Sequence, residues 1–178
     1  LGVEFKRWQP GEAERQDERE QMVNTLSSYH SGTTKVTDPL VINAMRSVPR
    51  HLFVPEYKRK SAYEDTPLAI GHGQTISQPF IVALMTQLLQ LKPGMVVLEV
   101  GTGSGYQAAI LNQIVTSVYT IEIIKPLARR ARKLYQALGL TSVNMREGDG
   151  YFGWPDNIKF DRIIVTAAAA HIPPPLIK

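Results

Sequence analysis

The chain of 178 residues contains no cysteine. This absence excludes disulfide bonds, thiolate metal sites and a cysteine nucleophile. The four histidines are scattered and lack the spacing of metal ligands, so we expect no metal site. No apolar stretch approaches the ~20 residues of a membrane-spanning helix, and no secretory leader is visible at the start. We therefore expect a cytoplasmic protein without a membrane partner.

The composition that is present is typical of a globular enzyme, with 43% hydrophobic and 20% charged residues. The length suffices for one domain with a substantial core. A net charge of +4 is compatible with a nucleic-acid partner, but the basic residues form only two short clusters, at 58–60 and 129–133. The second cluster shares a helical pattern with core-spaced apolar residues, which favours a solvated helix face. We expect no nucleic-acid partner and a monomer.

The first part of the chain is irregular in pattern. We expect these segments in order: a polar arm over 1–20 leading into a helix that ends near 29, a helix over 38–48, an extended piece over 50–55 and an irregular loop over 62–78. Asp38 and Pro39 suit the cap and first position of the second helix.

The rest of the chain alternates helices and strands. The expected elements are a helix over 79–91, a strand ending at 100, a helix from 106, a strand over 118–122, a helix over 126–138 closed by Gly139, and strands over 143–147 and 160–166. Such alternation predicts an α/β fold with a doubly wound, mostly parallel sheet. Four strands leave that sheet unfinished, and the first residue is Leu1 rather than methionine. We therefore expect C-terminal strands to be missing and upstream sequence to have been removed.

Residues 95–107 join an apolar run, three alternate glycines and the start of a helical pattern. The glycines are Gly101, Gly103 and Gly105. A strand, a tight glycine turn and a helix in this order let a nucleotide-like ligand approach bare backbone at the end of a parallel strand. The spacing differs from the dinucleotide fingerprint, and no lysine follows as in a phosphate-binding loop.

Three acidic residues lie at the ends of predicted strands, where ligands of such sheets bind. Glu99 precedes the glycines, where a carboxylate disfavours phosphate and suits an ammonium group. Glu122 follows about twenty residues on, where a carboxylate accepts hydrogen bonds from ribose hydroxyls. Asp149, between two glycines, suits an adenine amino group, although a turn-forming aspartate explains the same pattern. Together they favour S-adenosylmethionine, which carries an ammonium, a carboxylate and a sulfonium but no phosphate.

Several runs of this sequence resemble the protein-L-isoaspartate O-methyltransferase family, from about residue 22 to the last residue. The glycine motif alone is shared by many methyltransferases, whereas the run at 73–79 and the three prolines at 173–175 are more specific. The arm over 1–20 lies outside the resemblance. The runs that carry it are 48–55, 62–65, 67–71, 73–79, 97–107, 148–151 and 172–176.

The resemblance implies a Rossmann-like, S-adenosylmethionine-dependent methyltransferase domain over 21–178. Its helices and substrate loop would occupy 21–78, and its cofactor-binding αβ core 79–178. The implied reaction methylates the free α-carboxylate of isoaspartyl residues in damaged proteins and peptides, and leaves S-adenosyl-L-homocysteine. The ester then closes to a succinimide, which opens partly to normal aspartate. Because the carboxylate nucleophile is already ionised near neutral pH, no general base is needed, and positioning and water exclusion supply the rate.

The resemblance also implies which residues form the site. Ser77 is the implied catalytic residue, because its hydroxyl can donate one hydrogen bond to the carboxylate without adding charge. The same serine could instead cap the helix that begins near Pro79. The implied cofactor-binding residues are Thr75, Ile76, Glu99, Gly101, Thr102, Gly103, Ser104, Gly105, Tyr106, Glu122, Asp149 and Gly150.

The implied substrate-binding residues, besides Ser77, lie in two loops. Asp65 and Thr66 precede a proline, and a turn before that proline is the simpler interpretation. Ile172, Pro173 and Pro174 lie past the fourth strand, where prolines hold the chain extended and could pair it with an extended peptide. A rigid loop leading into the next helix explains that run equally well.

Other functions stay open at this point. A nucleic-acid or small-molecule methyltransferase on the same fold has the basic charge balance as its only support. The chain lacks both the Asn/Asp-Pro-Pro-aromatic tetrapeptide of amino-methylating enzymes and a cysteine for carbon-5 cytosine chemistry. A non-catalytic protein that binds an adenosine ligand is a further alternative.

Overall fold

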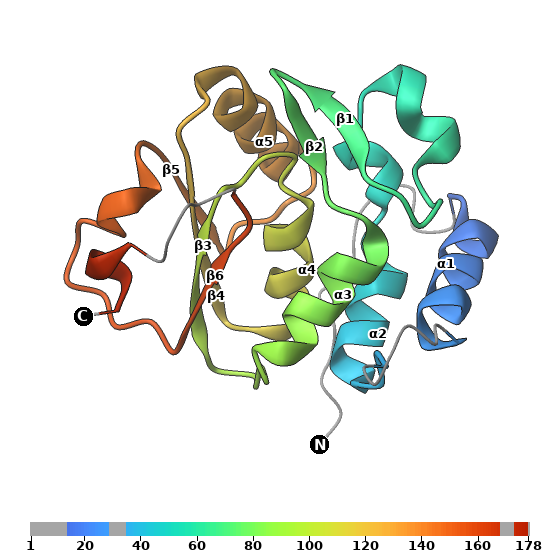
Figure 1. Ribbon diagram of the computed structural model, residues 1–178, viewed down its shortest axis with the longest axis horizontal. Helices are drawn as coiled ribbons and strands as arrows, with labels where there is room; N and C mark the ends of the chain where they lie inside the picture. The colour runs from blue at the N-terminus through green and yellow to red at the C-terminus, as the bar shows by residue number, and fades with distance from the viewer. Residues whose placement is uncertain (1–13, 29–34, 168–172, 178) are drawn as a thin grey trace.

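The computed structural model describes residues 14–28, 35–167 and 173–177. Its centre is a four-stranded parallel sheet in the order β5-β4-β3-β6, which confirms the predicted α/β fold (Figure 1). The strands are β3 (Val96–Val100), β4 (Ser117–Glu122), β5 (Val143–Glu147) and β6 (Arg162–Val165). Within the described ranges, no helix is long and apolar enough to cross a membrane.

The described residues form five α-helices, which pack on one face of the sheet or on one another: α1 (Gln16–Ser28), α2 (Pro39–Ser47), α3 (Pro79–Leu88), α4 (Tyr106–Ile114) and α5 (Lys125–Ala137). All residues of α4 are buried, because this helix lies between the sheet and α2 (Figure 1). Helix α2 begins as predicted, with Asp38 Oδ1 accepting a hydrogen bond from Leu40 N at 2.8 Å. Helix α3 ends at Leu88, three residues earlier than predicted.

The polar arm was expected to extend to residue 20, but α1 already begins at Gln16. Arg19 is buried in this helix together with Met22, Val23 and Leu26. The Arg19 guanidinium donates from Nη1 to Ser47 O at 2.9 Å, which ties α1 to the end of α2. Arg19, which was predicted to belong to the polar arm, is therefore part of the packed structure.

The expectation of an extended piece over 50–55 is wrong. Residues Arg50–Phe53 form a 3-10 turn, η1, in which Leu52 N donates to Pro49 O at 3.0 Å. The flanking prolines restrict only the residue before each of them, and Val48 and Val54 are indeed extended. The four residues Arg50–Phe53 are not restricted in this way and are free to turn. A second 3-10 helix, η2 (Glu56–Ser61), follows.

The expectation of an irregular loop over 62–78 is also wrong, because this stretch contains an antiparallel hairpin. Its strands are β1 (Leu68–Gly71) and β2 (Gln74–Ile76). The two turn residues, His72 and Gly73, have φ of 55° and 70°, as a tight hairpin turn of type I′ requires. The hairpin lies next to α5, where Arg130 Nη1 donates to Ile70 O at 3.5 Å (Figure 1).

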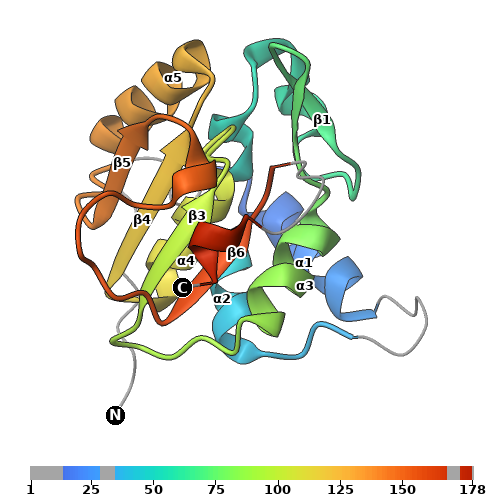
Figure 2. The same cartoon turned by 60° about the vertical axis from the view of Figure 1, so that its left-hand side comes forward.

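The core has two unequal parts. The larger cluster joins the N-terminal helices, α3, α4, α5 and one face of the sheet. On the other face, Leu98, Val100 and Ile121 are covered by apolar side chains of the segment before β6 and by Leu176 of η4 (Pro174–Leu176). Figure 2 shows these covering segments in front of the strands. The carboxyl ends of the strands remain accessible between these layers.

Candidate active site

A cleft of about 460 Å³ lies at the carboxyl ends of β3, β4 and β6, with β2 forming its opposite wall. This volume is in the range of small-molecule sites, and the position is where open α/β sheets bind ligands. Most of the residues predicted from the sequence line it. They are Thr75, Ile76, Ser77, Glu99, Gly101, Thr102, Gly103, Ser104, Tyr106, Glu122, Asp149, Gly150 and Pro173.

The glycine turn, residues 101–105, follows β3 and folds over the end of β4. Gly101 N donates to Ile121 O at 2.9 Å, and Gly101 has φ of 102°. A Cβ at this position would lie 2.8 Å from the Ala167 Cβ, so a side chain does not fit. Gly105 does not line the cleft; it closes the turn and precedes α4, and its carbonyl accepts a hydrogen bond from Tyr135 Oη at 3.1 Å. Glycine is therefore required at position 101, because the Ala167 residue approaches its Cα too closely for a side chain.

Glu99 is fully buried beneath this turn. Its Oε2 accepts a hydrogen bond from Thr120 Oγ1 at 2.5 Å, and that hydroxyl lies 2.6 Å from Thr102 Oγ1. Its Oε1 has no hydrogen-bond partner among the residues that the structure describes. Burial raises the pKa of Glu99 to about 8, although the Thr120 hydrogen bond opposes this effect. The carboxyl group therefore holds a proton at neutral pH unless a cation reaches it.

Glu122 supports the turn from the end of β4. Its Oε2 accepts from Gly103 N at 2.7 Å, and its Oε1 accepts from Ile124 N at 2.8 Å. Each carboxylate oxygen has further acceptor capacity after one such bond. The side chain therefore orders the protein backbone and still presents acceptors to the cleft.

Asp149 precedes the short 3-10 helix η3 (Gly150–Phe152), and its Oδ1 accepts from Tyr151 N at 2.9 Å. The turn-forming interpretation of Asp149 is thus present in the structure, and the residue also lines the cleft. Gly150 packs against β3, since a Cβ there would lie 2.5 Å from Val100 Cγ1. The two roles considered for Asp149 are geometrically compatible.

Ser77 is half-buried on the opposite wall, between β2 and α3. It does not cap α3, because the cap position is Gln78. Asp65 binds this helix end instead: its Oδ1 accepts from Phe80 N at 2.8 Å and its Oδ2 from Gln78 Nε2 at 2.9 Å. None of these hydrogen bonds, nor the one that the Ser77 carbonyl accepts from Arg50, uses the Ser77 hydroxyl. The hydroxyl is therefore available to a ligand.

The structure does not bring all of the predicted substrate residues into the cleft. Asp65 and Thr66 lie outside its lining, and Asp65 acts on the backbone after Ser77. Pro174 begins η4 and is exposed, whereas Pro173 is buried and lines the cleft. Ile172 lies outside the described residues.

Sequence reasoning missed several lining residues. Ile123 and Tyr151 are apolar, exposed by 62% and 41%, and follow Glu122 and Gly150 directly. Their position beside two predicted ligand residues was the signal that could have identified them. The other missed residues are Gln74, Val82, Val100, Gln107, Ile121, Ile124, Val165, Thr166 and Ala167. In the described part of the chain, no group of His, Asp and Glu residues has the arrangement of a metal site.

Comparison with known sequences gives a consistent result. The sequence profile of the protein-L-isoaspartate(D-aspartate) O-methyltransferase family matches residues 17–178. Protein-L-isoaspartate O-methyltransferase 1 of Cupriavidus necator is 57% identical over 141 residues, which cover 79% of this chain and 54% of the relative. Protein-L-isoaspartate O-methyltransferase 2 of Shewanella sediminis is 55% identical over 159 residues, which cover 89% of this chain and 64% of the relative. The chain thus spans between half and two thirds of the length of these relatives.

Solved structures share the fold. A protein-L-isoaspartate O-methyltransferase superposes with a TM-score of 0.80 at 29% identity, over 89% of this chain and 51% of that chain. A protein-L-isoaspartate O-methyltransferase from Plasmodium falciparum, in complex with S-adenosyl-L-homocysteine, superposes with a TM-score of 0.70 at 25% identity. That match covers 91% of this chain and 77% of the other.

Proposed function

The chain belongs to the protein-L-isoaspartate(D-aspartate) O-methyltransferase family, and on that premise we propose that it methylates the free α-carboxylate of L-isoaspartyl residues. The donor is S-adenosyl-L-methionine, and the substrates are damaged proteins and peptides. The resulting ester starts repair through a succinimide. One observation carries this proposal: Ser77 and the glycine turn line opposite walls of one cleft, although they are far apart in the sequence.

The residues of the cleft fit the proposed cofactor. The unpartnered Oε1 of Glu99 offers a buried acceptor to the ammonium group of the methionine moiety. A cation there would lower the pKa of Glu99 and stabilise its charged form. Glu122 offers acceptors to the ribose, and Asp149 offers one to the adenine amino group. The relative from Plasmodium falciparum, which binds S-adenosyl-L-homocysteine, supports the same assignment.

On the acceptor side, the chain has to hold and orient a carboxylate. When bound, S-adenosyl-L-methionine supplies an electrophilic methyl group on its sulfonium. The Ser77 hydroxyl donates one hydrogen bond to the substrate carboxylate and so orients one oxygen toward the donor wall, which is the side of the cleft formed by the glycine turn, Glu99 and Glu122. The N-terminal end of α3 contributes little positive potential, because Asp65 already binds the Phe80 N–H there. Pro173 borders the cleft where the rest of the peptide enters.

We propose in addition that the protein is a cytoplasmic monomer without a nucleic-acid partner. The absence of cysteine is compatible with a reducing compartment. The basic residues of α5 lie on a helix whose apolar residues Leu127, Ala128 and Ala131 are buried, which supports a solvated face. Size-exclusion chromatography with light scattering tests the oligomeric state.

A methyl-transfer assay tests the proposed function. Tritiated S-adenosyl-L-methionine is supplied with an isoaspartyl peptide, its aspartyl twin or an RNA pool. We expect label in the isoaspartyl peptide alone, released as methanol when the ester hydrolyses. Label in RNA alone would favour a nucleic-acid methyltransferase. Cofactor binding without transfer to any of them would favour a non-catalytic binding protein.

A further inference from the structure

Arg50 is fully buried in η1 and lies outside the lining of the cleft. Its Nε donates to Ala62 O at 2.8 Å, and its Nη2 donates to Ser77 O at 2.7 Å. Ala62 precedes the β1–β2 hairpin, and Ser77 follows it. One side chain therefore holds the backbone on both sides of the hairpin.

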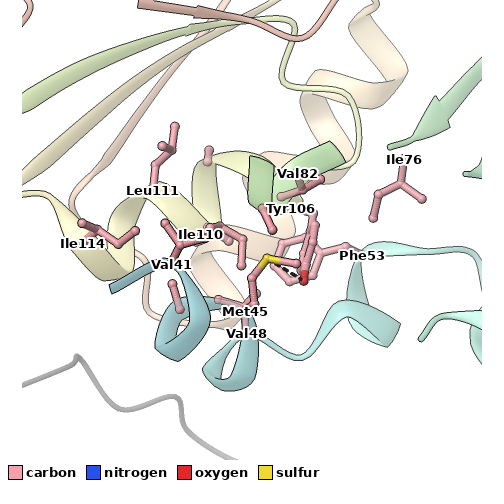
Figure 3. Close-up of a cluster of buried hydrophobic side chains, with 14 of the residues drawn as sticks. Val41, Met45, Val48, Phe53, Ile76, Val82, Tyr106, Ile110, Leu111 and Ile114 are labelled. Carbon is pink, nitrogen blue, oxygen red and sulfur yellow. Dashed lines mark hydrogen bonds between the residues drawn. The ribbon is translucent and has the colours of Figure 1, made fainter. Parts of the chain in front are cut away.

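The same guanidinium reaches the donor wall. Its Cζ lies 4.9 Å from the ring centroid of Tyr106, the first residue of α4 and the residue directly after the glycine turn. Tyr106 is fully buried, and Phe53 packs against it edge-on with ring centroids 5.5 Å apart. Figure 3 shows the Tyr106 ring beside Phe53 and Met45, below Val82. The ring is thus a rigid reference point attached to the glycine turn.

We propose that Arg50 is a positioning residue, which sets the separation between the Ser77 segment, residues 74–78, and the glycine turn. This inference rests on the proposed function and identifies a residue that acts through Ser77 without touching a ligand. Arg50 binds the Ser77 carbonyl and leaves its hydroxyl available to the acceptor. A displacement of about 1 Å at a reacting group is enough to slow a reaction roughly 100-fold.

A contribution to folding stability does not by itself explain why an arginine is buried at position 50. No ion pair joins Arg50 to another described residue, and its Nη1 has no hydrogen-bond partner there. Burial of a cation that has no carboxylate in ion-pair contact is costly. It lowers the pKa of Arg50, and the nearby Tyr106 and Asp65 offset this effect only in part. What the guanidinium supplies is a planar fork that contacts two carbonyls while it stacks on a ring. A lysine ammonium provides no such fork.

The test compares Arg50→Lys with Arg19→Lys. Arg19 is a matched control, because it is also a buried arginine that donates to a backbone carbonyl, Ser47 O at 2.9 Å, but it does not line the cleft and does not bind the Ser77 segment. Four quantities are measured for each variant: the kcat and the KM for methyl transfer to an isoaspartyl peptide, the Kd for S-adenosyl-L-homocysteine, and the hydrogen exchange of amides 74–78. Circular dichroism and thermal unfolding report the fold.

We expect Arg50→Lys to lower kcat by roughly 100-fold with a near-normal Kd for the cofactor product, and to raise exchange in the Ser77 segment. Arg19→Lys lowers the thermal midpoint but changes neither kcat nor that exchange. Equal kcat values for the two variants, or equal exchange over 74–78, would overturn the proposal. If the unsubstituted chain transfers no methyl group, the proposed function fails, whereas the exchange comparison still decides whether Arg50 positions Ser77. If Arg50→Lys does not fold, Arg50→Gln serves for the same comparison.

Discussion

The glycine turn and the Ser77 segment line the same cleft, but different contacts hold them in place. The turn is fixed by hydrogen bonds to the neighbouring strand β4: Gly101 N donates to Ile121 O, and Gly103 N donates to Glu122 Oε2. The Ser77 segment is fixed by two polar side chains from the preceding part of the chain, Arg50 and Asp65. The donor wall is therefore held by contacts between neighbouring strands, one of them through the Glu122 side chain. The acceptor wall is held by the β1–β2 pairing and by side chains from an earlier part of the chain. Substitutions on the two walls should have separable effects.

The largest effect is expected on the donor wall, from Gly101→Ala. The new Cβ would lie 2.8 Å from Ala167 Cβ at a φ of 102°, so the turn has to move. We expect the affinity for S-adenosyl-L-homocysteine to weaken more than ~100-fold, a loss of about 3 kcal/mol of binding free energy. Calorimetry measures this affinity. Gly139→Ala is the control, since its φ is also positive, 64°, but no atom lies within 4 Å of its Cβ. A similar loss of affinity in both variants would contradict the steric argument.

On the acceptor wall, which is the side of the cleft formed by the Ser77 segment, Ser77→Ala should change turnover and leave cofactor affinity unchanged. Loss of one hydrogen-bond donor at the reacting carboxylate lowers kcat by about 100-fold, while the affinity for S-adenosyl-L-homocysteine stays near that of the unsubstituted chain. Steady-state kinetics and calorimetry measure the two quantities. Ser61→Ala, outside the cleft, controls for loss of a serine hydroxyl. A folded Ser77→Ala variant with normal turnover would remove the catalytic role.

Glu99 predicts a pH dependence of stability that arises on the donor wall. Its pKa is raised from an ordinary 4.5 to about 8, so between these values the folded chain keeps a proton that the unfolded chain releases. The free energy of unfolding should therefore fall as pH rises through this window, by at most about 1.4 kcal/mol per pH unit. Denaturant titrations at several pH values should show the slope, and Glu99→Gln should remove it.

The same group couples proton release to cofactor binding. An ammonium group beside Glu99 stabilises the carboxylate, so binding at neutral pH should release a proton and strengthen as pH rises toward 8. Calorimetry in two buffers of different protonation enthalpy detects that release. Binding without proton exchange, or an unchanged exchange in Glu99→Gln, would place the ammonium elsewhere.

The smallest effect is expected from Asp65→Ala. Asp65 and Asp38 each bind the first turn of a helix through a carboxylate oxygen 2.8 Å from a backbone N–H. Removal of either should lower the free energy of unfolding by about 1 kcal/mol. Only Asp65→Ala should also lower kcat, by several-fold, because only α3 continues the Ser77 segment. Equal kinetics in the two variants would mean that Asp65 only stabilises its helix.

The same contrast explains what could be predicted from the sequence. The strand at 143–147 and the glycine turn follow from local periodicity and from glycine chemistry, and the structure has them as predicted. The hairpin was missed because His72 gives no turn signal of its own, although the alternation at Leu68 and Ile70 was readable. The role of Arg50 could not be predicted, since nothing local distinguishes a buried arginine from a solvated one.

The contacts of Glu122 have a consequence for the rate of ligand capture. Because Gly103 N and Ile124 N hold both carboxylate oxygens in place, the acceptors that face the cleft are oriented before any ligand arrives. A ligand with two neighbouring hydroxyls then replaces bound solvent without an ordering step in the protein. Association with this wall should be a single fast phase, whose rate scales linearly with ligand concentration. A saturating rate would instead indicate a conformational step that precedes capture.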